Sequence, residues 1–115
     1  MVEPTPFRRP VNWAKIRTDE AERIIRERAE DSGNVYFGVH AFERVNDRSI
    51  TQPDAIRILR TGYIDRPLQR NLDGEWEAVI VKKMPGCREV GVVTIVYQEG
   101  SDLFVKTVEW MDWNR

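Results

Sequence analysis

The sequence predicts an α+β domain, with helices in its first half and antiparallel strands in its second half. Residues 1–62 carry helix start and stop signals around one short apolar run, and residues 63–110 carry four runs of β-formers separated by turn signals. Because the two kinds of element are segregated along the chain, the class is α+β. At 115 residues and 41% hydrophobic composition, the chain is long enough for one core.

The first 34 residues are expected to form an irregular arm and then a helix. Residues 1–11 hold three of the six prolines and show no periodicity. A helix is predicted from about residue 19 to residue 31, with Thr18 as its N-cap and Gly33 or Asn34 as its stop signal. Its apolar stripe is narrow, which indicates a surface helix; the stripe consists of Ala21, Ile24, Ile25 and Ala29.

Residues 35–115 are expected to form one compact unit that begins with a short strand and two helices. The apolar run VYFGV at 35–39 predicts the strand, and a helix is predicted over residues 40–47. The second helix has a strong start signal, because Thr51 and Asp54 form a capping-box pair around a first-turn proline. Gly62 is expected to end it.

The second half predicts a four-stranded antiparallel meander. The strands are expected at residues 63–70, 75–83, 89–97 and 103–110, and Asp73-Gly74 and Pro85-Gly86 supply two of the turns. The run VGVVTIVY is apolar on both faces of a strand, so this strand should be central and covered on both sides. The N-terminal helix is one candidate for the second cover.

Composition restricts the classes of function. The net charge of −1 gives no global attraction for nucleic acid, although residues 37–70 carry six arginines against four acids. One cysteine cannot form an internal disulfide, and the N-terminus lacks the order of a secretion signal, so a cytoplasmic protein is expected. Membrane insertion is not expected, because no apolar run approaches roughly 18 residues.

Motifs for metal and nucleotide chemistry are absent. A zinc site needs about four ligands, and the chain has one histidine and one cysteine. The sequence contains no GxxxxGK[ST] loop, no GxGxxG fingerprint and no GxSxG elbow. We therefore expect no metal site and no cofactor.

Three residues at helical spacing remain as catalytic candidates: His40, Arg44 and Arg48. An imidazole can move protons near neutral pH, and guanidinium groups bind phosphate oxygens through paired donors. This chemistry suits RNA, whose 2′-hydroxyl is itself the nucleophile, so that a base, an acid and positive charge suffice. A structural role stays open, in which the histidine caps its own turn and Arg44 pairs with Asp47.

A second basic group lies at the end of a predicted hairpin and consists of Lys82, Lys83 and Arg88. It is either a weaker candidate for RNA phosphate contacts or a solvated strand edge. The aromatic residues have a similar pair of interpretations. Trp76, Trp110 and Trp113 could stack bases, but tryptophans on strands more often belong to the core.

These residues resemble the family called domain of unknown function 4258 over about residues 36–110. That family carries a His-Ala-x-x-Arg-x-x-x-Arg stretch, an Ile-Thr helix start and a Leu-x-x-Gly helix end, matched here by His40-Ala41, Arg44, Arg48, Ile50-Thr51 and the segment 59–62. The later strands DGEWEAVIVKK, REVGVVTIVY and LFVKTVEW follow in the same order. The layout is similar to that of the RelE/ParE toxins, in which a strand and two helices accompany an antiparallel sheet.

The resemblance implies a small bacterial or phage toxin-like protein. RelE-type members are metal-independent ribonucleases that act on messenger RNA at the ribosome and are neutralised by an antitoxin protein, whereas ParE-type members poison DNA gyrase. This chain differs from the family in being slightly acidic and in having an N-terminal extension of about 35 residues. It could form oligomers through the N-terminal helix or through the sheet. The alternative is a non-enzymatic protein-interaction module on the same scaffold.

Overall fold

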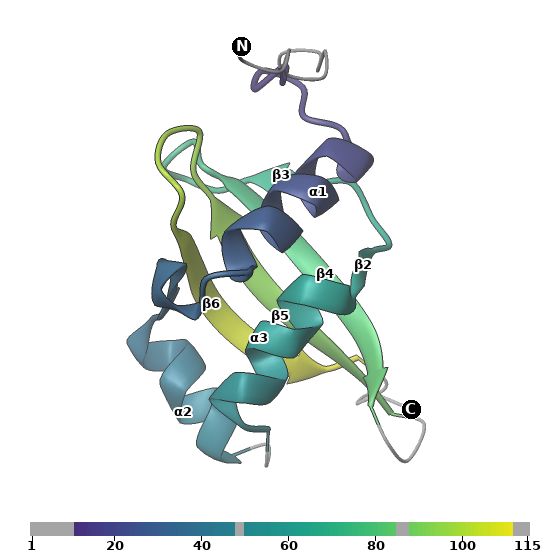
Figure 1. Ribbon diagram of the computed structural model, residues 1–115, viewed down its shortest axis with the longest axis vertical. Coiled ribbons are helices and arrows are strands. Elements are labelled where there is room, and N and C mark those ends of the chain that lie inside the picture. Colours follow the sequence, from purple (N-terminus) through teal and green to yellow (C-terminus); the bar gives the residue numbers. More distant parts are fainter. Residues whose placement is uncertain (1–10, 48–49, 85–87, 112–115) are drawn as a thin grey trace, which may run out of the picture.

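The computed structural model describes residues 11–47, 50–84 and 88–111 (Figure 1). Over these residues it has three α-helices, a short 3₁₀ helix η1 (Ser32–Asn34) and six strands. The α-helices are α1 (Thr18–Ala29), α2 (Val39–Asp47) and α3 (Gln52–Thr61). The strands are β1 (Val35–Phe37), β2 (Tyr63–Ile64), β3 (Gln69–Arg70), β4 (Trp76–Met84), β5 (Arg88–Val96) and β6 (Leu103–Trp110). The α+β class is therefore confirmed.

The strands form one mixed sheet in the order β1-β6-β5-β4-β2, and β3 also pairs with β4. The antiparallel succession of β4, β5 and β6 matches the predicted meander, and β5 is central. Two features differ from the prediction. The strand expected at 63–70 is divided into β2 and β3, with Pro67, which has no N–H for a ladder, between them. In addition, β1 joins the sheet parallel to β6, with Val35 opposite Leu103.

The three helices share one core with one face of the sheet. Figure 1 shows α1 and α3 side by side across the sheet, and they are in mutual contact, while α2 packs on β6 and β1. Helix α1 contributes Ala21, Ile25 and Ala29 to this core, and all three are fully buried. Because α1 and α3 lie on the same face, α1 is not the second cover that the apolar central strand was expected to need.

The opposite face of the sheet carries no helix in the described part of the chain. On this face Val81 and Ile95 are buried without belonging to the shared core. Tyr36 is exposed there beside its β6 partner Phe104, and Lys106 forms an ion pair with Glu77 at 2.8 Å. The strands therefore protect this face with their own side chains.

The helix boundaries agree with the capping prediction at α3 and differ at α1. Thr51 and Asp54 form the predicted capping box, with two bonds of 3.0 and 3.1 Å. In α1 the N-cap is Arg17, which makes no side-chain cap bond, and Thr18 is already the first helical residue. The helix also ends at Ala29, before the expected stop, because residues 32–34 form η1.

Gly62 ends α3 as predicted, but for a different physical reason. Its backbone is extended, with φ of −79°, so it is not the left-handed cap that usually favours glycine. A Cβ at this position would lie 2.7 Å from the carbonyl oxygen of Ile58 and 2.8 Å from that of Val81. The glycine is needed because α3 and β4 approach closely here.

We therefore expect Gly62→Ala to lower the free energy of unfolding by about 1–3 kcal/mol, because two backbone atoms would have to move. Urea denaturation measures this loss. Gly33→Ala is the matched control, since the nearest atom to its added Cβ is a flexible carboxylate oxygen of Asp31 at 3.1 Å. Equal stability of Gly62→Ala and the wild type would show that the junction has room to spare.

Candidate functional site

Helix α2 carries His40 and Arg44 on successive turns. Ala41 and Val45 face the core and are buried, which turns His40 toward solvent and leaves Arg44 half-buried at the edge of the helix. Neither side chain makes a hydrogen bond or an ion pair with residues 11–45, 50–84 or 88–111, so the structure gives His40 no turn-capping role among these residues. The side chain of Asp47, the expected partner of Arg44, lies outside the described part of the chain. Arg48 lies outside the described residues. The structure therefore brings two of the three catalytic candidates together.

Two large apolar side chains border this pair on the same helix. Val39 is 80% exposed and Phe42 is 52% exposed. Helix α2 begins at Val39, one residue earlier than predicted, and this start places both side chains on its outer face. The surface formed by Val39, His40, Phe42 and Arg44, named here the α2 surface, thus combines an imidazole and a guanidinium with apolar contact area.

The basic residues of the β4–β5 hairpin do not form one cluster. Lys82 and Lys83 are neighbours on a strand, so their side chains point to opposite faces of the sheet. The guanidinium of Arg88 lies over the ring of Trp110 at 4.1 Å. These residues belong to β4 and β5, whereas α2 packs on β6 and β1, so they lie apart from the α2 surface.

A carboxylate lies beside Lys83 on the helix-free face of the sheet. Glu89 is the cross-strand partner of Lys83, and it accepts a hydrogen bond of 3.1 Å from the hydroxyl of Tyr63. This bond and the charge of Glu89 raise the pKa of Tyr63 above its ordinary value. The negative charge weakens the attraction of Lys83 for a phosphate.

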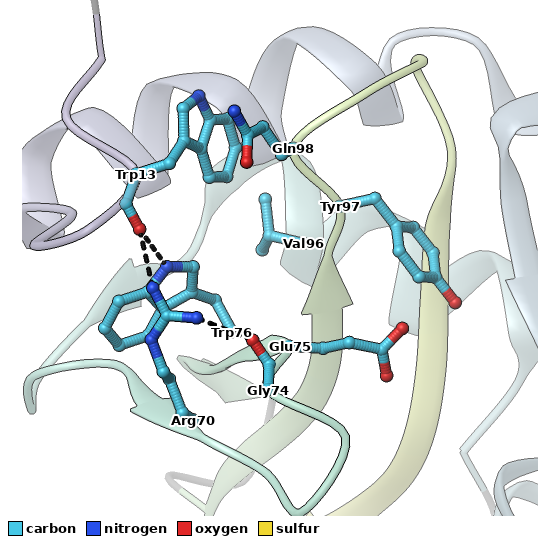
Figure 2. A pocket seen from close by; sticks show the side chains of 8 residues that line it. All are labelled: Trp13, Arg70, Gly74, Glu75, Trp76, Val96, Tyr97 and Gln98. Atoms are coloured by element: carbon cyan, nitrogen blue, oxygen red, sulfur yellow. Dashed lines mark hydrogen bonds between the residues drawn. The ribbon is translucent and has the colours of Figure 1, made fainter.

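A pocket of about 170 Å³ lies at the end of the sheet where β4 begins and β5 ends (Figure 2). Its lining consists of Trp13, Arg70, Gly74, Glu75, Trp76, Val96, Tyr97 and Gln98. The sequence predicts Trp76 as a stacking candidate but not Trp13, which lies between the proline-rich arm and α1. The sequence signal for Trp13 was its identity as a tryptophan. No local pattern predicts that its indole lies near the indole of Trp76.

The carbonyl oxygen of Trp13 organises one side of this pocket. It accepts a hydrogen bond of 2.7 Å from the indole nitrogen Nε1 of Trp76 and another of 3.0 Å from Arg70. Arg70 also donates to the carbonyl oxygen of Gly74 at 2.7 Å, and its guanidinium lies 4.3 Å from the centre of the Trp76 ring. Trp76 and Trp110 are both partly buried against the core, while Trp113 lies outside the described residues.

The described residues contain no group of three or more histidine, cysteine or acidic side chains placed to hold a metal ion. Within the same ranges, none of the helices has both the length and the apolar character needed to cross a bilayer. Comparisons with protein-family models, with curated proteins and with solved structures gave no match to this chain.

The Tyr63–Glu89 bond predicts a measurable titration. Tyr63 should form tyrosinate at higher pH than an ordinary tyrosine, and Glu89→Gln should return its pKa toward about 10, because both the acceptor charge and its repulsion are lost. Since the folded protein holds this proton more tightly than the unfolded chain, the associated stability is present below pH about 10 and is lost at higher pH.

The measurement is the ultraviolet absorbance of tyrosinate, taken as the difference between each protein and its Tyr63→Phe derivative. Glu109→Gln is the control, because it removes a carboxylate from β6 without affecting the bond to Tyr63. A Tyr63 titration that is the same in wild type and Glu89→Gln would contradict the assignment.

Proposed function

We propose that this chain is a RelE/ParE-like toxin domain of the bacterial or phage cytoplasm that cleaves messenger RNA without a metal ion. The observation that carries the proposal is the exposed imidazole of His40, one helical turn from Arg44 on the same helix. Residues 11–45, 50–84 and 88–111 give neither side chain a hydrogen-bond or ion-pair partner. An exposed imidazole beside a half-buried guanidinium on one helix is available to a phosphodiester. The resemblance of residues 36–110 to the toxin-like family supports the same reaction class.

The α2 surface can supply a base and positive charge to RNA. His40 takes the proton of a 2′-hydroxyl, whose oxygen then attacks the adjacent phosphorus. The bond from phosphorus to the 5′-oxygen breaks, that oxygen takes a proton from water, and a 2′,3′-cyclic phosphate remains. Arg44, together with Arg48, binds the phosphate oxygens and stabilises the extra negative charge of the transition state.

The β4–β5 hairpin has a smaller part in this proposal. Lys82 and Lys83 diverge to opposite faces, and the Arg88 guanidinium is stacked on Trp110, so the three do not converge on one phosphate. Lys83 is the exposed one of the two lysines and has Glu89 beside it. These residues would contribute at most one outlying contact to an RNA strand.

The proposal predicts that His40→Ala lowers the rate of RNA cleavage by about 10²-fold or more, because it removes the base. Cleavage of a labelled messenger fragment by purified protein measures the rate. The reaction should persist in EDTA, leave a cyclic phosphate, and fail where the 2′-hydroxyl is replaced by hydrogen. Arg44→Ala should also cleave RNA slowly, because it removes a guanidinium that binds the phosphate oxygens.

Arg57→Ala is the matched control, because Arg57 is an exposed arginine on α3 and does not belong to the α2 surface. It should cleave like the wild type. Cleavage that EDTA abolishes, or that survives unchanged in His40→Ala, would overturn the proposal.

A second candidate is a non-enzymatic interaction module that docks a protein, such as an antitoxin or a cellular target, on the α2 surface. The exposure of Val39 and Phe42 favours it, because exposed aromatic and aliphatic side chains on one helix face are typical anchors of protein interfaces. Growth of an expressing bacterial culture separates the two candidates. An interaction module should arrest growth equally with and without His40, and should lose this effect in Phe42→Ser.

A further inference from the structure

The pocket between Trp13 and Trp76 has two flat aromatic walls. Figure 2 shows the indole of Trp13 on one side, the stacked pair of Arg70 and Trp76 on the other, and the side chain of Val96 between them. Tyr97 and Glu75 extend away from the Trp13 indole in the same view. A flat ring would have aromatic and guanidinium surfaces to stack on and an aliphatic side chain beside it.

The second wall is held in place before any ligand binds. The Trp13 carbonyl oxygen accepts from both Trp76 and Arg70, so the segment that carries the first indole also fixes the second. Arg70 is fixed further by its bond to Gly74. A site whose walls are already bonded to each other loses little conformational entropy when it binds a ligand.

Charge and polarity narrow the class of ligand. The guanidinium of Arg70 covers a face of Trp76, so an organic cation would meet positive charge where an aromatic cage offers it a free ring face. Gln98 is exposed at the rim, forms no hydrogen bond with another described residue, and presents both donors and an acceptor. A ring with donors and acceptors on its edge uses this amide, whereas a hydrocarbon ring would not.

We infer that this pocket binds one unpaired nucleobase, stacked between the indole of Trp13 and the Arg70–Trp76 pair, with its polar edge toward Gln98. The cavity of about 170 Å³ suits a single ring system rather than an extended ligand. Unpaired bases are commonly recognised by stacking on aromatic and guanidinium planes together with hydrogen bonds at their edges.

The pocket lies away from the α2 surface, since Figure 1 shows α2 and β3 at opposite ends of the sheet. A base here belongs either to a single RNA strand that is held at a distance from His40 or to a free nucleotide. Only the first case rests on the proposed function. Binding of the base itself does not depend on RNA cleavage.

Binding is tested by titrating the full chain with the four nucleoside 5′-monophosphates, with ribose 5-phosphate and with a single-stranded tetraribonucleotide. The indole N–H signals in nuclear magnetic resonance spectra report where each probe binds. At least one monophosphate should shift the signals of Trp13 and Trp76, and ribose 5-phosphate should not. Tighter binding of the oligonucleotide assigns the base to RNA, and equal binding assigns it to a free nucleotide.

Trp13→Ala should weaken binding by roughly 5- to 150-fold, the range expected for losing one stacking partner. The variant keeps the Trp13 carbonyl oxygen that bonds Trp76 and Arg70, so the second wall stays in place. Gln98→Ala alters only an exposed side chain and should change the order of preference among the four bases. Tyr36→Ala, which removes an exposed aromatic ring at the far edge of the sheet, is the control and should bind like the wild type.

Three outcomes would overturn the inference: no binding of any monophosphate at millimolar concentration, equal shifts with ribose 5-phosphate, or wild-type binding by both Trp13→Ala and Gln98→Ala. Each readout is binding rather than cleavage. If the protein binds bases but does not cleave RNA, the proposed function is refuted, while the base-binding site is still supported.

Discussion

The apolar stripe of α1 is buried between α3 and the sheet, and this contact sets the position of most other elements. Ala21, Ile25 and Ala29 are fully buried, and α1 is in contact with α3. Helix α3 contributes Ala55, Ile58 and Leu59 to the same core, and these residues are also fully buried. Burying one isoleucine side chain is worth about 1.5–3 kcal/mol, so α1 is part of the core that stabilises the domain.

Arginine side chains strengthen this contact by binding carbonyl oxygens across elements. Arg60 of α3 donates to the carbonyl oxygens of Ala29 and Glu30 at 2.7 and 3.0 Å, which satisfies the free C-terminal end of α1. Arg26 donates to Gly62 at 2.7 Å. Arg28 donates to Tyr97 at 2.8 Å, and burial lowers the pKa of its guanidinium. Part of the basic composition is therefore structural and unavailable to a nucleic acid.

The same arrangement explains why the two proposed surfaces are separate. Docking of α1 on α3 brings the preceding segment across the start of β4, where the Trp13 carbonyl oxygen bonds Trp76. Helix α2 instead follows β1, whose parallel pairing with β6 holds it at the other end of the sheet. A strand of RNA that used both surfaces would cross the molecule, with a stacked base at one end and the α2 surface at the other.

Local patterns were sufficient for the elements whose signals lie within a few residues. The Thr51 and Asp54 capping box, the helix end at Gly62, the central place of β5 and the face shared by His40 and Arg44 all follow from short spacings in the sequence. They are predictable because capping, helical periodicity and strand alternation depend on neighbouring residues.

Tertiary structure alone decided the features that depend on contacts between distant residues. These include the parallel pairing of β1 with β6 and the placement of α1 beside α3 rather than on the opposite face. The contact between Trp13 and Trp76 also depends on tertiary structure, because a hydrogen bond between residues 63 positions apart produces no periodic pattern in the sequence. The sequence determined which residues were available for chemistry, and long-range packing determined which of them meet.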